Sequence, residues 1–160
     1  MKFKHIISIA LLLSSLSFAE TKYPFWGVVG YSSDIDGDSG AVAGIRYGQQ
    51  SRDWRTSFTL ESKYQNQQLF TVQIDRTLLY SLSTSKLRVY GGIIGAAIAQ
   101  DKDDGSSDKN LGYGYGLSAG LMFYLSDKVD LDLGVRYIKV TDLDHIDEIK
   151  SVGFAMHYFF

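Results

Sequence analysis

The last twelve residues of the chain, 149–160, constrain its fold more than any other stretch, because they alternate strictly and end on an aromatic residue. One phase holds Val152, Phe154, Met156, Tyr158 and Phe160, and the other holds Ser151, Gly153, Ala155 and His157. A period of two is typical of a strand whose two faces meet different surroundings. An edge strand of a soluble sheet rarely ends this way, with no polar residue to cover the edge. The stretch therefore predicts a terminal strand with one apolar face.

Alternation of the same kind recurs along the rest of the chain. It predicts strands at residues 25–33, 40–48, 54–64, 70–80, 87–100, 111–123, 129–137 and 149–160. In the first and the fifth of these segments the alternation does not decide which residues face outward. In the first we expect Phe25, Val29 and Tyr31 to point outward, in preference to Trp26 and Val28.

Segment 111–123 is the strongest internal evidence, because large side chains on one face alternate with glycine on the other. The small face consists of Gly112, Gly114, Gly116, Ser118 and Gly120. Glycine at every second position is costly in a helix and adds nothing to a soluble sheet core. In a narrow barrel it leaves room for long side chains that reach across from other strands.

These strands predict an all-β fold, an eight-stranded antiparallel up-and-down transmembrane β-barrel. Within a membrane every backbone donor and acceptor must be paired inside the protein, so only a closed barrel can use such strands. With both termini in the periplasm, the connections 34–39, 66, 101–110 and 141–148 lie outside the cell, and 49–53, 81–86 and 126–128 lie inside. A soluble barrel of the lipocalin type shares the alternation, but its inner face would be apolar, whereas here one face carries charges and glycine.

Residues 1–19 have the features of a secretory signal peptide. Lys2 and Lys4 precede a short apolar run, and the small residue Ala19 stands just before Glu20. The run is well short of the roughly 20 residues of a membrane-spanning helix, which argues against an anchor. We therefore expect export, and a single barrel domain at residues 20–160.

Composition excludes several classes of function. The chain has no cysteine, which excludes disulfides and thiol chemistry. Removal of residues 1–19 takes the formal net charge from −2 to −4, so a nucleic-acid partner is not expected. No pattern calls for a cofactor, and we expect a monomer.

The alternating terminal motif Phe154-x-Met156-x-Tyr158-x-Phe160 resembles the last strand of bacterial outer-membrane barrels, and the whole pattern resembles the small OmpA/OmpX/Ail-type proteins. The resemblance implies insertion in the outer membrane of a Gram-negative cell, and recognition of the motif by the barrel-assembly machinery. It also implies a structural role or surface contact through the outer loops. Nothing follows Phe160, so the cell-wall domain of full OmpA proteins is not implied.

The inward phase collects nine ionisable residues, five positive and four negative: Arg46, Arg55, Glu61, Lys63, Asp75, Arg88, Asp130, Asp132 and Arg136. Eight strands enclose a lumen that side chains can fill. Since buried charges persist when they are paired, we expect a structural ion-pair plug. The alternative is a small channel, in which rearranged pairs open an ion path.

Three cations fall on the outward, lipid-facing phase. Lys139 and Lys150 lie near the outer ends of neighbouring strands, where a lysine costs little, and they form a possible clamp for lipopolysaccharide phosphates; plain snorkelling is the other interpretation. Arg76, between Ile74 and Leu78, needs a bulge or snorkelling toward the headgroups.

The loops are acidic, and the segment Asp34-x-Asp36-x-Asp38 superficially resembles a calcium loop. Ser39 replaces the glycine at its sixth place and Ile45 the glutamate at its twelfth, so we expect no metal site.

A lipid-A-modifying enzyme is a further alternative, because some small outer-membrane barrels are enzymes. Only His145 and His157 remain after the signal peptide, and the His-x-Ser-Asn signature of the deacylases is absent. We therefore expect no catalytic residues.

Overall fold

The computed structural model of the chain describes residues 22–35, 37–63, 67–80, 86–101, 109–143 and 146–160. The predicted signal peptide lies outside these residues. Eight strands are present: β1 (Tyr23–Ile35), β2 (Asp38–Gln50), β3 (Trp54–Lys63), β4 (Gln67–Tyr80), β5 (Leu87–Asp101), β6 (Lys109–Tyr124), β7 (Val129–Thr141) and β8 (Glu148–Phe159). None of the described residues belongs to a helix long and apolar enough to cross a membrane.

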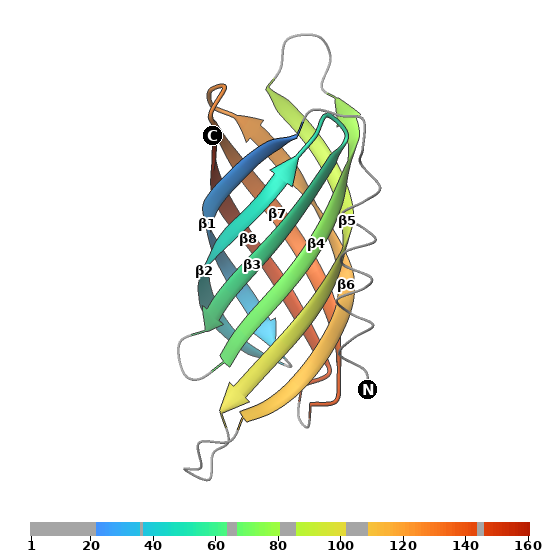
Figure 1. Ribbon diagram of the computed structural model, residues 1–160. Coiled ribbons are helices and arrows are strands. Elements are labelled where there is room, and N and C mark those ends of the chain that lie inside the picture. The colour runs from blue at the N-terminus through green and yellow to red at the C-terminus, as the bar shows by residue number, and fades with distance from the viewer. Residues whose placement is uncertain (1–21, 36, 64–66, 81–85, 102–108, 144–145) are drawn as a thin grey trace.

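Each strand pairs antiparallel with the next, and β8 pairs with β1, so the sheet closes into a barrel (Figure 1). The predicted fold class is confirmed. We call the end with the connections β1–β2, β3–β4, β5–β6 and β7–β8 the loop end. The other end, which holds the start of β1 and the end of β8, is the turn end.

Most strands are longer than predicted, and the first hairpin is the clearest case. The prediction of a loop at residues 34–39 is wrong, because the pairing of β1 with β2 continues to Ile35 and Asp38. Gly37 adopts a φ of 86°, which suits glycine in so tight a turn. Its backbone N–H donates to the Asp34 carboxylate at 2.7 Å, so Asp34 stabilises the hairpin.

The predicted orientation of β1 is also wrong. Trp26 is 53% exposed on the outer surface, whereas Phe25 is fully buried in the lumen with Val29. The register explains the difference, because Trp26 lies opposite Tyr158 on the outer face of β8. Phe25 packs inside against the rings of His157 and Phe159. Both phases of β1 contain apolar residues, so alternation alone could not choose between them.

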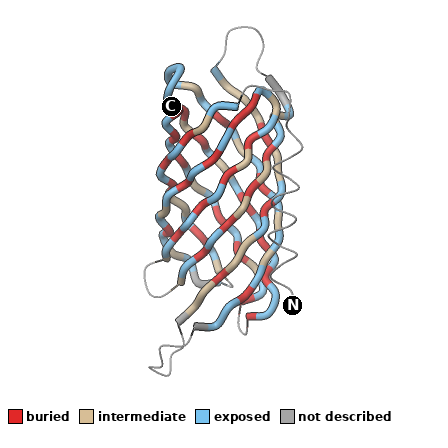
Figure 2. Tube along the Cα trace, viewed as in Figure 1, coloured by how far each residue is buried: buried red, intermediate tan, exposed pale blue. Residues whose placement is uncertain are grey.

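The outer surface is apolar, and buried and exposed residues alternate along most of the strands (Figure 2). Large exposed side chains include Ile45, Leu60, Leu117, Leu133, Val152 and Phe154. Aromatic side chains gather on this face toward the turn end: Trp26, Tyr47, Trp54, Phe123, Tyr158 and Phe160. A surface of this kind is the inverse of a water-soluble protein's, in which large exposed apolar areas are avoided.

The lumen is filled by side chains of two kinds. Toward the loop end lies a buried apolar cluster, formed by Leu69, Ile94, Ile98, Ile138, Val140, Leu143, Ile146 and Ile149. Ionic and hydrogen-bonding side chains fill the remainder toward the turn end. The apolar cluster was not predicted, since we expected charged and small residues throughout the lumen.

Glycines on the inner face make room for these side chains, as predicted for β6. A Cβ built at Gly120 would lie 2.5 Å from the Tyr90 hydroxyl, and one at Gly112 would collide with the Leu143 side chain.

Candidate functional site

Arg55 is the centre of a buried ionic cluster in the lumen. Its Nη2 lies 2.5 Å from Asp130 Oδ2, and its Nη1 lies 3.0 Å from Asp132 Oδ2. Its Nε donates to the Gln50 amide oxygen at 2.8 Å. Since the guanidinium reaches β7 from β3, this group connects walls of the barrel that do not pair with each other.

Arg46, on β2, extends the cluster. Its Nη1 lies 3.5 Å from Asp132 Oδ2, its Nη2 donates to the Tyr31 hydroxyl at 2.5 Å, and its Nε donates to Thr59 at 3.1 Å. Tyr90 donates to the other Asp132 oxygen at 2.7 Å. Each of these charges therefore has hydrogen-bond partners that offset its loss of water.

His157, on β8, is enclosed within the same cluster. Its Nδ1 lies 2.6 Å from Asp130 Oδ1, and the Phe25 ring packs against it. The imidazole has no solvent-exposed surface. The other histidine considered as a candidate, His145, lies outside the described residues.

A second ion pair lies closer to the apolar cluster. Arg136 donates to Glu61 through both terminal nitrogens, at 2.6 and 2.5 Å, and its guanidinium lies 4.0 Å from the centre of the Tyr31 ring. Its Nε has no hydrogen-bond partner among the described residues.

Asp75 is a buried carboxylate held by neutral donors. Its oxygens accept hydrogen bonds from the Gln73 amide at 2.9 Å and from the Ser118 hydroxyl at 2.8 Å. Seven of the nine residues predicted to face the lumen are thus almost fully buried: Arg46, Arg55, Glu61, Asp75, Asp130, Asp132 and Arg136.

Lys63 and Arg88 also face inward, but each is only half-buried, near opposite ends of the barrel. Lys63 lines a pocket at the loop end. Arg88 lies at the turn end, where it donates to the Arg52 carbonyl oxygen at 3.3 Å and packs over the Tyr124 ring.

Sequence reasoning missed three members of the ionic cluster: Tyr31, Gln50 and Tyr90. Tyr31 was assigned outward with the wrong phase of β1, and the phase of β5, which carries Tyr90, was left open. His157 shares the inward phase of β8 with Ser151 and Ala155, and this phase predicts its inward position correctly, but it does not predict the contact with Asp130.

The outward cations lie near the predicted positions. Lys139 and Lys150 are exposed on β7 and β8. Lys150 forms an ion pair with Glu148, which also accepts a hydrogen bond from Tyr137 at 3.1 Å. Glu148 lies opposite Lys139 in the β7–β8 ladder, so it is a neighbour of both lysines.

A bulge lies next to Arg76. It is one of the two features expected to accommodate an arginine on the outward face. The β4–β5 register shifts between Thr77 and Leu79, and Leu78 points outward. The Arg76 guanidinium lies 5.4 Å from the centre of the Trp54 ring on the outer surface.

The side chains of the terminal motif Phe154, Met156, Tyr158 and Phe160 all lie exposed on the outer face of β8. The Phe160 N–H donates to the Pro24 carbonyl oxygen at 3.2 Å.

No cluster of three potential metal ligands occurs among the described residues. Asp36 of the calcium-like segment lies outside them.

The fold is similar to solved eight-stranded barrels. Neisserial surface protein A is 19% identical with a TM-score of 0.61, and the match covers 87% of this chain and 97% of that one. Outer membrane protein H (OprH) of Pseudomonas aeruginosa is 22% identical with a TM-score of 0.62, over 86% and 99%. Ail, the attachment invasion locus protein of Yersinia pestis, in complex with the heparin analogue sucrose octasulfate, is 14% identical with a TM-score of 0.52, over 87% and 97%.

The resemblance to the small OmpA/OmpX/Ail-type barrels is thereby confirmed at the level of the fold. No protein-family model matches the sequence, and no curated protein matches it.

Proposed function

We propose that this chain is an integral outer-membrane barrel with a closed lumen, which acts structurally and by surface contact rather than by transport. One observation carries the proposal: an apolar exterior surrounds an interior in which buried arginines pair with Asp130, Asp132 and Glu61, and one end is filled by apolar side chains. Residues 1–19 would direct export.

The exterior supports the membrane assignment. Outward residues along the strands are large and apolar, and aromatic residues gather near the turn end, as in the interfacial girdles of outer-membrane barrels. The solved barrels of the same fold include an outer membrane protein and a surface protein.

The interior supports a structural rather than a conducting role. An ion crossing the lumen would have to break the Arg55–Asp130 and Arg136–Glu61 pairs. It would also have to pass the apolar cluster, which offers it no ligand in place of water. The channel alternative therefore needs two separate rearrangements.

The proposal also assigns this chain a role in contact with surfaces outside the cell. Ail, which shares the fold, is an attachment invasion protein whose structure holds a heparin analogue. The connections at the loop end would provide the corresponding contact here.

Two experiments test the proposal. The detergent-extracted protein should migrate differently on cold SDS gels before and after boiling, as folded outer-membrane barrels do. In planar bilayers the folded protein should give no stable conductance steps, with boiled protein as the control. An unshifted, water-soluble product would contradict the membrane barrel, and stable steps would favour the channel.

Two further partners are proposed from the outer surface. Lys139 and Lys150 would contact lipopolysaccharide phosphates. The barrel-assembly machinery would recognise the motif formed by Phe154, Met156, Tyr158 and Phe160. Unchanged lipopolysaccharide co-purification with the Lys139→Ala/Lys150→Ala variant would contradict the clamp. We propose no catalytic residue, no cofactor and a monomeric state.

A further inference from the structure

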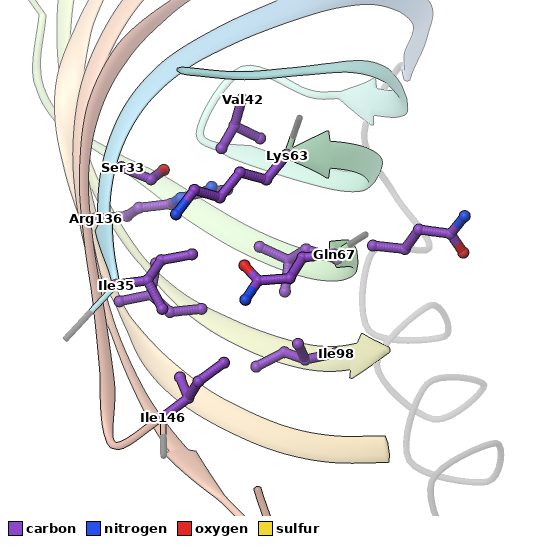
Figure 3. A pocket seen from close by; sticks show the side chains of 11 residues that line it. Ser33, Ile35, Val42, Lys63, Gln67, Ile98, Arg136 and Ile146 are labelled. Carbon is purple, nitrogen blue, oxygen red and sulfur yellow. The ribbon is translucent and has the colours of Figure 1, made fainter. Parts of the chain in front are cut away.

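The loop end of the lumen leaves little space for a ligand. The side chains that line the hollow there, among them Lys63, Ile98 and Ile146, converge on it from different walls of the barrel (Figure 3). The space between them has room for about one water molecule, which is too little for an organic ligand. A lipid would therefore meet the barrel on its outer surface rather than in this hollow.

Arg76 of β4 is a cation on the apolar outer surface. Its side chain is exposed, and it lies opposite Trp54 of β3 in one ladder and opposite Gly91 of β5 in the other. The three strands lie side by side in the wall of the barrel (Figure 1). Trp54 is one of the aromatic residues that gather toward the turn end, as in an interfacial girdle. Arg76 therefore lies at the level of the lipid headgroups.

Apolar groups border the Arg76 guanidinium. It lies 5.4 Å from the centre of the Trp54 ring. Toward β5 the Leu78 side chain lies over Gly91, where a Cβ would be 3.2 Å from Leu78 Cδ1. The β4–β5 bulge places Leu78 on the outer face, where it is exposed. An indole ring and a leucine thus flank the cation without supplying a carboxylate or a carbonyl oxygen.

The guanidinium has no anionic partner in the part of the chain that the structure describes. There it contacts the Trp54 ring and forms no ion pair with a carboxylate. A guanidinium carries several N–H donors, and leaving them without acceptors is costly where water is scarce. Its planar fork matches phosphate oxygens bidentately, and phosphate is the acceptor that phospholipid headgroups present at this level.

The unbalanced charge of Arg76 favours an anionic phospholipid. Phosphatidylglycerol carries a net negative charge, whereas the ammonium group of phosphatidylcholine offsets the charge of its own phosphate. Because no carboxylate pairs with Arg76 among the described residues, the anionic headgroup gains more from the contact.

We propose that Arg76 and Trp54 form a binding site for the phosphate of an anionic phospholipid in the periplasmic leaflet. The guanidinium donates bidentately to the phosphate, the Trp54 ring holds the guanidinium in place, and Leu78 contacts the acyl chains. The site rests on the proposed function, which inserts the barrel in the membrane with its turn end on the periplasmic side.

The test measures which lipid lies next to each tryptophan of the mature protein in vesicles. The chain has two tryptophans, so Trp26→Phe leaves Trp54 as the fluorophore, and Trp54→Phe leaves Trp26. The vesicles contain equal mole fractions of phosphatidylglycerol and phosphatidylcholine, with bromine on the acyl chains of one lipid or the other. Bromine quenches a tryptophan that it contacts, so the ratio of the two quenching values gives the lipid preference at that position.

Phosphatidylglycerol should be preferred about fivefold at Trp54, as expected for one arginine at an anionic surface. Trp26 should show no preference. It also lies exposed toward the turn end, but its neighbours in the two ladders are Tyr47 and Tyr158 rather than an arginine.

Three variants in the Trp26→Phe background sharpen the test. Arg76→Met should abolish the preference at Trp54. Arg76→Lys keeps the charge but lacks the planar fork, and should retain only part of the preference. Lys128→Met is the matched control, because it removes an exposed cation of the turn end that lies in the connection between β6 and β7, and it should leave the preference unchanged.

Equal quenching by the two lipids at Trp54 would overturn the site, and so would a preference that survives Arg76→Met. An equal loss in Lys128→Met would overturn it too, because the overall charge of the turn end would then be the cause. Quenching of neither tryptophan by either lipid would overturn the proposed membrane barrel, and the site with it.

Discussion

Arg136 on β7 and Glu61 on β3 meet inside the lumen through two parallel hydrogen bonds of 2.6 and 2.5 Å, although their strands do not pair in the sheet. Both side chains are almost completely buried. A bidentate pair of this kind fixes the geometry of both partners. It links opposite walls of the barrel next to the apolar cluster, since Arg136 also lines the pocket with Ile98 and Ile149.

Removal of one partner of this pair should cost more than removal of both. Glu61→Leu leaves the Arg136 charge buried without its carboxylate, and we expect the free energy of unfolding to fall by about 3–5 kcal/mol. The double variant Glu61→Leu/Arg136→Met leaves no unpaired charge and should lose less than Glu61→Leu alone. Urea unfolding in lipid vesicles, followed by the fluorescence of Trp26 and Trp54, measures both. A double variant that loses the sum of the single changes would contradict the coupling.

Arg55 should be the most sensitive cation of the lumen. Arg55→Met removes the counter-charge of both Asp130 and Asp132, and we expect a loss of at least about 3–5 kcal/mol. If this variant does not fold, the cold SDS gel will show no heat-dependent shift. Lys139→Met is the matched control, because it removes a cation from the exposed surface and should change stability little. Equal effects of the two substitutions would contradict the importance of the buried cluster.

Two glycines of neighbouring strands should respond differently to a methyl group. A Cβ at Gly120 would lie 2.5 Å from the Tyr90 hydroxyl and would also press on the backbone of β7, so Gly120→Ala should cost about 1–3 kcal/mol. Gly95 has no heavy atom within 4 Å of its Cβ position, and Gly95→Ala should be neutral or slightly stabilising. The same unfolding assay compares them. A greater loss at Gly95 would contradict the packing.

Arg76 and Trp54 make a contact on the outer surface that can be tested separately. The guanidinium lies 5.4 Å from the indole centre, and Arg76→Met should cost about 0.5–1 kcal/mol through the loss of a cation–π contact. It should also change the emission of Trp54, whereas a Trp54→Phe background should abolish that change. If the emission difference persists without Trp54, the contact is not its source.

The period-two pattern predicted the strands, their number and most of their orientations, because one face of each strand is apolar and the other polar. It failed on β1, where Phe25 and Trp26 are equally apolar and only the register with β8 decides between them. It also missed the apolar cluster. Ile138 and Val140 continue the inward phase of β7 beyond Arg136, but they resemble outward residues when taken singly.

The members of the ionic cluster could be predicted from phase, but their pairing could not. Arg55 and Asp130 are 75 residues apart, and their contact depends on how the barrel closes. Nothing in the local sequence of Arg55 distinguishes it from Arg88, which lies half-buried at the turn end.

Leu143 helps to close the loop end of the lumen, and its place there depends on the absence of a side chain at Gly112. Leu143 is buried in the connection between β7 and β8, and a Cβ at Gly112 of β6 would collide with it. Gly112→Ala should therefore cost about 1–3 kcal/mol by displacing Leu143. Leu143→Ala should cost about 2–5 kcal/mol by opening a cavity. In the double variant the new methyl group fills part of the space that the leucine leaves, so the loss should be smaller than the sum of the single losses by at least about 0.5 kcal/mol. Urea unfolding of all four proteins under one condition measures this coupling, and strict additivity would show that Leu143 does not pack on Gly112.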